Sequence, residues 1–146
     1  MNNIILVSTA ILVNKKGKLL LTQRPLGKNM EGLWEFPGGK LEPNETPFSA
    51  VIREIQEELA VRLDPTEIYN FSFAYHDYTA FRVCSLAYCC FAWQGEISGN
   101  EGQQFRWVDI DQIADFQLIP PISEQFINDL KLYLGSRCLI PLREVT

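Results

Sequence analysis

The sequence has little basic charge, a single histidine and no pair of cysteines at Cys-x-x-Cys spacing. Lysine and arginine number 13 against 18 aspartates and glutamates, so the formal net charge is −5. Proteins that hold nucleic acid through a broad surface are basic, so the composition predicts no stable nucleic-acid binding, while a nucleotide in a local pocket remains open. An acidic chain that handles phosphates would need metal ions between the like charges.

The few cysteines and the absence of a long apolar run limit the metal sites and the cellular compartment that we expect for this protein. With His76 as the one histidine, a zinc site is not expected. The apolar run at residues 4–13 lacks a basic leader and is too short to span a bilayer. We therefore expect a reduced, cytoplasmic protein without a membrane partner. The cysteines are Cys84, Cys89, Cys90 and Cys138, and the first three, in an apolar run, are expected as buried thiols.

The length of 146 residues and the 47% of hydrophobic residues suit one domain with a real core. We see no repeat, linker or low-complexity tract, so residues 1–146 are expected as a single domain, with the tail 136–146 ambiguous. Strands are expected at residues 4–13 and 18–24, as a hairpin around the turn at 14–17. Further strands are expected at residues 67–75 and 80–93, joined by a turn at 76–79, and at 105–110 before a short acidic helix.

Two main helices are expected. The first begins at Thr46, a hydroxyl N-cap followed by proline, and the second lies between Pro120-Pro121 and Gly135. Mixed strands with two helices predict a sheet covered by helices, of the α/β class. The apolar residues of the first helix recur at helical spacing and are expected to face the core: Phe48, Val51, Ile52, Ile55 and Leu59.

Three glutamates of the first helix pose the main question of the sequence. Glu54, Glu57 and Glu58 are spaced i, i+3, i+4, so their carboxylates project from one side of the helix and repel one another. Pairing of Arg53 with Glu57 would satisfy at most one of the three charges. Divalent cations would satisfy the rest, and magnesium in particular joins a few carboxylates to substrate phosphates. The alternative is a solvated acidic helix face.

The loop before this helix can complete such a site. Gly38-Gly39 allows close approach of the backbone, and its carbonyls can add oxygen ligands. Lys40 offers a point charge to a phosphate. Glu45, just before the helix, is expected to organise the loop.

The spacing from Gly39 through Glu45 to the run Arg53-Glu54-Ile55-Gln56-Glu57-Glu58 resembles the Nudix box of the Nudix hydrolases. Ala60 replaces the usual glycine of that box. A glycine there would let the helix end in a left-handed turn, a conformation that costs alanine roughly 1 kcal/mol. We therefore expect a slightly altered helix exit and an intact site.

The resemblance extends beyond the box. The segments LLLTQRPLGKNMEGLWEFPGGKLEPNET, NEGQQFRWV and IPPISEQFI look like the MutT-type branch, whose members cleave nucleoside triphosphates such as 8-oxo-dGTP. This resemblance implies an α/β/α sandwich around a mixed sheet and magnesium as cofactor, with manganese as an alternative. The implied reaction converts a nucleoside triphosphate substrate into a monophosphate and pyrophosphate.

The resemblance also implies residue roles. Arg53 would orient the carboxylates, and Glu54, Glu57 and Glu101 are each candidates for the general base. Ser123 falls where the branch often has asparagine or aspartate, so a weaker preference for 8-oxo-dGTP over dGTP is expected. Metal binding is implied for the Gly38 carbonyl, Glu54, Glu57, Glu58 and Glu101. Substrate binding is expected for Arg24, Phe36, Lys40, His76, Tyr78 and Ser123.

Three alternatives stay open at this point. The substrate could be a pyrimidine triphosphate or another nucleoside diphosphate derivative. The domain could bind nucleotide or protein without turnover, although all box carboxylates are present. A calcium-binding structural domain lacks the alternating Asp/Asn loop that would support it. We expect a monomer or a weak dimer.

Overall fold

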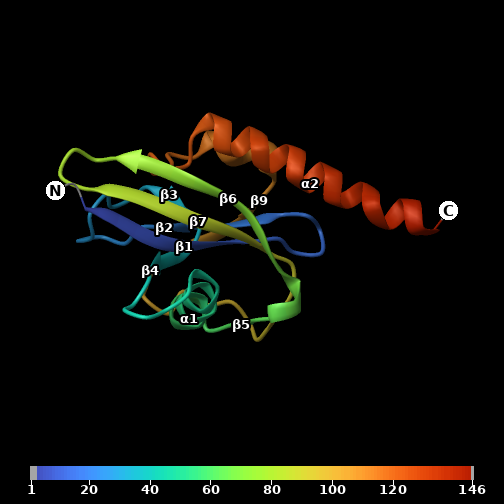
Figure 1. The fold of residues 1–146 in the computed structure, drawn as a ribbon, viewed down its shortest axis with the longest axis horizontal. Coiled ribbons are helices and arrows are strands. Elements are labelled where there is room, and N and C mark those ends of the chain that lie inside the picture. The colour runs from blue at the N-terminus through green and yellow to red at the C-terminus, as the bar shows by residue number, and fades with distance from the viewer. Residues whose placement is uncertain (1–2, 146) are drawn as a thin grey trace.

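The structure, a computed structural model, describes the backbone of residues 3–145 and the side chains of residues 3–137. A sheet layer lies between two helices, α1 (Pro47–Leu59) on one side and α2 (Glu124–Val145) on the other (Figure 1). This arrangement confirms the predicted α/β/α sandwich. The strands are β1 (Ile4–Leu12), β2 (Leu19–Gln23), β3 (Trp34–Glu35), β4 (Gly38–Lys40), β5 (Arg62–Leu63), β6 (Ile68–Asp77), β7 (Arg82–Cys90), β8 (Trp93–Gln94) and β9 (Phe105–Val108).

The largest sheet is mixed and has the strand order β4-β1-β7-β6. β1 runs parallel to β7 and antiparallel to β4, while β6 and β7 are antiparallel. A second sheet has the order β3-β2-β9, and β5 pairs with β8. Short 3₁₀ turns occupy Pro65–Glu67 and Ile110–Asp115, the latter where the short acidic helix was expected.

β1 divides the core between the two helices. Because successive side chains of a strand point to opposite faces, Ala10 and Leu12 pack in the cluster with α1, whereas Ile11 and Val13 pack in the cluster with α2. All four are buried. The continuous apolar run of residues 4–13 thus reflects a strand covered on both faces along its C-terminal half.

The predicted hairpin of residues 4–13 and 18–24 is wrong beyond its turn. The turn is present, since the Asn14 N–H donates to the Lys18 carbonyl at 3.0 Å, and a single bridge joins Val13 to Leu19. Past that bridge the strands separate, and β1 joins β4 and β7 while β2 joins β3 and β9. The turn at 76–79 is also displaced, because β6 extends to Asp77 and the turn lies at residues 78–81.

α1 begins as predicted. Thr46 is the N-cap, Pro47 is the first helical residue, and Ser49 closes a reciprocal capping box with Thr46. Val51, Ile55 and Leu59 are fully buried and Ile52 is partly buried. Phe48 is a correction to the prediction, because its side chain is 38% exposed and meets the Tyr88 ring edge-on at the margin of the helix.

α2 runs past the predicted end at Gly135 and continues to Val145. A glycine inside a helix costs only about 1 kcal/mol, and contacts of Arg137 hold the helix beyond it. The Arg137 guanidinium lies 4.2 Å from the Tyr69 ring centroid and 3.8 Å from that of Phe91, and it pairs with Glu67 at 3.3 Å. The ambiguous tail 136–146 is thus helical to residue 145, and residue 146 lies outside the described residues.

Two further expectations can be compared with the described residues. Cys89 and Cys90 are buried thiols, whereas Cys84 is only partly buried, and the Cys138 side chain lies outside the described ones. Within the part of the chain that the structure describes, no helix is both long enough and apolar enough to cross a membrane.

Candidate active site

β4 holds the Gly38-Gly39 pair between β1 and α1. It pairs antiparallel with β1, where Gly38 faces Thr9 and Gly39 faces Ser8. A side chain at Gly38 would collide with the Ser8 carbonyl, and one at Gly39 would collide with the Glu54 carboxylate. The β1 backbone therefore leaves no room for a side chain at Gly38, whereas a side chain at Gly39 would displace the end of the Glu54 side chain.

Arg53 organises the acidic face of α1. Its Nε and one terminal nitrogen donate to the two Glu45 carboxylate oxygens at 2.7 and 2.8 Å, a bidentate pair. The other terminal nitrogen lies 3.0 Å from Glu54 Oε1 and 3.2 Å from Glu57 Oε2. A fifth contact, to the Lys40 carbonyl at 3.1 Å, joins the helix to the end of β4.

The contacts between Arg53 and Glu45 lower the pKa of the carboxyl and raise that of the guanidinium, so both groups stay charged. Hydrogen bonds from Arg53 and from the Glu42 backbone lower the pKa of Glu45 to about 2. The Glu45 carboxylate raises the pKa of Arg53 above its ordinary value. Glu45 is therefore a carboxylate and Arg53 a cation over the whole neutral range, as a fixed orienting pair requires.

Burial and neighbouring negative charge disfavour the ionised forms of Glu54 and Glu58. Burial, together with the charges of Glu101, Glu35 and Glu54, raises the pKa of Glu58 to about 8, against a hydrogen bond from the Gly38 backbone. Burial also raises the pKa of Glu54, although Arg53 opposes the shift. Nearby positive charge would therefore be bound favourably on this face.

The loop at residues 98–103 is tied to the C-terminal end of α1. Asn100 N–H and the Gln103 side-chain amide both donate to the Glu58 carbonyl, at 2.9 and 3.2 Å. The Asn100 amide donates to the Glu57 carbonyl at 3.3 Å, and the Glu101 N–H donates to Gln103 Oε1 at 2.9 Å. Helix-end carbonyls that would otherwise lack partners thus hold Glu101 beside the acidic face.

The donors of this face suit a divalent cation. The carboxylates of Glu54, Glu58 and Glu101 repel one another. Burial disfavours the ionised form of Glu58, and a bound cation would stabilise that form. Among the described residues, no three acidic, histidine or cysteine side chains converge as a ready metal cage. Magnesium in proteins usually keeps several waters and takes further oxygen ligands from substrate phosphates.

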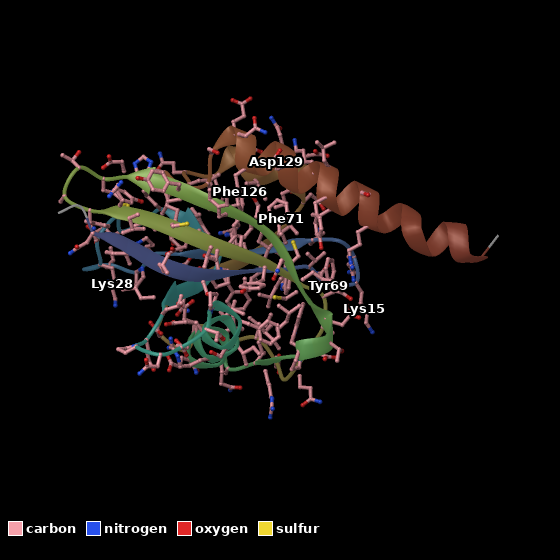
Figure 2. All side chains as sticks on the ribbon, in the orientation of Figure 1. Lys15, Lys28, Tyr69, Phe71, Phe126 and Asp129 are labelled. Atoms are coloured by element: carbon pink, nitrogen blue, oxygen red, sulfur yellow. The ribbon has the colours of Figure 1, made fainter. Side chains whose placement is uncertain are left out.

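A cavity of about 740 Å³ is bordered by Gly38, Gly39 and Lys40 of β4. Its floor is the face of the main sheet opposite α1, and α2 contributes Phe126, which meets the Phe71 ring of β6 at 5.4 Å (Figure 2). Phe36 is buried beside Phe126, at a ring distance of 6.2 Å. Among the residues expected in the site, the cavity lining includes Arg24, Phe36, Gly38, Lys40 and Tyr78.

Arg24 and Glu35 stand between this cavity and a smaller recess of about 110 Å³. They form an ion pair at 3.0 Å. Burial raises the pKa of Glu35, and Arg24 opposes that shift. Both residues line the cavity and also the recess, whose other walls include Glu58 and Glu101.

The NUDIX domain family matches residues 5–130. The chain belongs to the NUDIX domain family. The 8-oxo-dGTP diphosphatase of Haemophilus influenzae is 35% identical over 128 residues, which cover 87% of this chain and 91% of that protein. The CTP pyrophosphohydrolase of Escherichia coli is 31% identical over 122 residues, 81% of this chain and 88% of that protein. A solved MutT structure, described for Aliivibrio salmonicida and Vibrio cholerae, is 29% identical with a TM-score of 0.71, covering 86% of this chain and 95% of that chain.

The Nudix box is thus confirmed as the mark of the family, and its helix exit differs from our expectation. Ala60 adopts the left-handed conformation, with φ 61° and ψ 25°, and its N–H bonds the Gln56 carbonyl at 3.1 Å. The helix ends as it would with glycine. The expected alteration of the exit is wrong, and Ala60 remains in an unfavourable conformation.

Two of the expected Nudix substrate residues lie outside the cavity lining. His76, on β6, meets the Tyr78 ring edge-on at 4.5 Å, and of the two only Tyr78 lines the cavity. The exposed Ser123 caps α2, because its hydroxyl accepts the Phe126 N–H at 3.1 Å. The lining therefore favours Arg24, Phe36, Lys40 and Tyr78 as substrate contacts over these two.

Sequence reasoning missed four residues that the structure brings to the candidate site: Glu35, Phe81, Asn100 and Gln103. Glu35 could have been found, since it lies within the WEF stretch one residue from Phe36. Nothing local marks Gln103, because its partners at Glu58 and Glu101 depend on how the loop folds back onto α1.

Proposed function

We propose that this protein is a magnesium-dependent nucleoside triphosphate pyrophosphohydrolase that removes oxidised purine nucleotides such as 8-oxo-dGTP. The observation that carries the proposal is the junction of the two hollows. A nucleoside-sized cavity meets an acidic recess at Arg24 and Glu35, and Glu58 and Glu101 line the recess. A base in the cavity would leave its phosphates pointing to the carboxylates. Relatives named 8-oxo-dGTP diphosphatase support this choice of substrate.

The acidic face supplies the chemistry. The Gly38 carbonyl with Glu54, Glu57, Glu58 and Glu101 would hold magnesium, or manganese, and when bound the metal neutralises polyphosphate charge and acidifies water. Arg53 keeps Glu54 and Glu57 in place through its hydrogen bonds. One carboxylate then accepts the proton of the attacking water, and Glu54, Glu57 and Glu101 are the candidates. Lys40 and Arg24 supply positive charge to the phosphates.

The decisive experiment is hydrolysis of a nucleotide panel with magnesium, with monophosphate and diphosphate products resolved. We expect a nucleoside monophosphate and pyrophosphate, with the highest kcat/KM for 8-oxo-dGTP. In oxygen-18 water the label should enter pyrophosphate, as attack at the β phosphorus requires. Label in the monophosphate would indicate attack at the α phosphorus, and orthophosphate as the direct product would contradict the proposal.

A pyrimidine triphosphate is the second candidate, because a relative of similar identity is named CTP pyrophosphohydrolase. The placement of Ser123 outside the cavity lining also leaves the cavity without the polar residue expected to read an oxidised purine. The same panel separates the two candidates, since a higher kcat/KM for CTP or dCTP than for any purine would favour the second. A third possibility, binding without turnover, would show nucleotide binding and no product.

The composition and the fold support a proposal for the compartment, the oligomeric state and the ligands of this protein. The protein acts in the cytoplasm as a single domain of residues 1–146, as a monomer or weak dimer, on free nucleotides and without stable nucleic-acid binding. The net charge of −5 supports this preference for small ligands. Size-exclusion chromatography with light scattering tests the oligomeric state, and filter binding with DNA and RNA tests the rest.

A further inference from the structure

The turn between β6 and β7 carries aromatic rings to the cavity. The Tyr78 and Phe81 centroids are 5.2 Å apart and their planes differ by 27°, so the two rings are stacked. His76 meets the Tyr78 ring in an edge-on contact at 4.5 Å. Tyr78 and Phe81 both line the cavity, and neither is part of the acidic face.

Backbone contacts fix this pair. The Tyr78 N–H donates to the Phe81 carbonyl at 2.9 Å, and the Thr79 N–H donates to the Asp77 carboxylate at 2.8 Å. Thr79 has φ 75°, a left-handed conformation that a β-branched residue rarely adopts. The tight turn therefore sets both rings at the cavity edge in a defined orientation.

The pair also lies close to the junction of the two hollows. Burial raises the pKa of Tyr78, while the charge of Arg24 lowers it and that of Glu35 raises it, so the Tyr78 hydroxyl is within electrostatic reach of this ion pair. Lys28, which lines both hollows, lies at the end of the molecule where the β6–β7 turn is drawn (Figures 1 and 2). A base against the rings would thus sit next to the path of its phosphates.

The floor of the cavity offers little to read the edge of a base. It is formed by sheet residues with small or apolar side chains, among them Ala74, Val83 and Ala87, with Thr9 and Ser85 as the polar exceptions. Aromatic faces bind any base through its ring surface, and this stacking tolerates different hydrogen-bonding edges. A larger ring system covers more of such a surface.

We propose that Tyr78 and Phe81 form an aromatic wall on which the base of the nucleotide stacks, and that this wall selects bicyclic purines over the smaller pyrimidines. The proposal rests on the proposed function in taking the cavity as the nucleotide site. It does not depend on turnover, because stacking acts on the base of a product as well as on that of a substrate.

The test is binding of dGMP and dCMP, measured by calorimetry without added metal. We expect Tyr78→Leu and Phe81→Leu each to weaken dGMP binding by about tenfold and to reduce the ratio of dGMP to dCMP affinity. Tyr78→Phe and Phe81→Tyr keep the rings and should keep native binding. Phe73→Leu is the matched control, since Phe73 lies on β6, is 64% exposed and does not line the cavity. Thermal unfolding verifies that each variant is folded.

Unchanged dGMP affinity in both leucine variants would overturn the aromatic wall. An equal loss of dGMP affinity in the Phe73→Leu control, or no dGMP binding by the native protein, would also overturn it. An unchanged ratio of dGMP to dCMP affinity would overturn the selection of purines. Where dGTP is hydrolysed, the leucine variants should raise KM and leave kcat near native. Ring-dependent dGMP binding without hydrolysis of any triphosphate would support the wall and contradict the proposed function, so the two failures are distinguishable.

Discussion

Ala60 shows what a single residue costs at the end of α1. Its φ of 61° lies in the left-handed region, where a Cβ is unfavourable and glycine is not. We expect Ala60→Gly to raise the free energy of unfolding by about 0.5–1 kcal/mol, the left-handed cost less the greater chain entropy of glycine. Urea denaturation measures this. Gln56→Gly, within the helix, should act in the opposite direction, and a loss of stability in both variants would contradict the argument.

Glu57 is the exposed member of the acidic face, and it accepts a hydrogen bond from Arg53. Glu57→Gln keeps the size of the side chain and removes the negative charge with which the carboxylate would bind a metal ion or accept a proton. We expect native thermal stability and a kcat lower by at least about 100-fold, with activity in the native protein abolished by excess EDTA. The exposed Glu96, substituted in the same way, is the control. Near-native turnover in Glu57→Gln would contradict the assignment of this face.

At the scale of elements, the loop at residues 98–103 depends on Gln103, which holds both Glu101 and the end of α1. Loss of a residue that orients metal-site groups commonly costs 10- to 100-fold in activity or metal affinity. We expect Gln103→Ala to lower kcat by about tenfold and to raise the magnesium concentration needed for half-maximal rate. Gln104→Ala removes an exposed neighbour and should change neither. A purely structural role for Gln103 would lower Tm and leave the magnesium dependence native.

The start of α2 depends on Ser123, whose hydroxyl accepts the Phe126 N–H. Ser123→Ala removes this cap and should cost about 1 kcal/mol in the free energy of unfolding. Ser123→Asn retains a capping oxygen, so we expect native stability and an unchanged ratio of kcat/KM for 8-oxo-dGTP over dGTP. Denaturation and steady-state kinetics measure the two. A widened ratio in Ser123→Asn would instead support the base contact that the resemblance suggests.

Local signals predicted the elements well and their partners poorly. Thr46 and Pro47 mark the start of α1 because a cap acts within one turn, and the box carboxylates follow from helical spacing alone. The hairpin of residues 4–13 and 18–24 failed because its turn is local, whereas β1 pairs with β7, in which each partner lies 78 positions later in the chain, from Ile4 with Arg82 to Leu12 with Cys90. Gly135 failed as a helix end for the same reason, since Arg137 holds α2 to rings that are distant in the chain.

For the whole molecule, Glu45 and Glu58 give stability two opposite dependences on pH. The pKa of Glu45 is about 2 in the folded state, below its ordinary value of 4.5, so its contribution is present above pH 4.5 and is lost as pH falls toward 2. The pKa of Glu58 is raised to about 8, so its contribution is present below pH 4.5 and is lost as pH rises toward 8.

We therefore expect the metal-free protein to lose stability both in acid and as pH rises from 4.5 to about 8, as measured by Tm. Magnesium should restore Tm at the alkaline end, because a cation stabilises the ionised carboxylates. Glu58→Gln should flatten the alkaline side alone, and Glu45→Gln the acid side alone. An alkaline slope that persists in Glu58→Gln would assign it to another group.

The parallel pairing of β1 with β7 has a consequence for the order in which the chain can fold during synthesis. β1 is made first, but its nine-residue partner ends at Cys90, and until then its neighbour in the sheet is the three-residue β4. Long-range pairing is slow and leaves apolar strands open in the meantime. A nascent chain that stops before residue 90 thus carries a finished acidic helix and an unpaired apolar strand. Arrested ribosomes should yield protease-resistant chains only once β7 has left the exit tunnel.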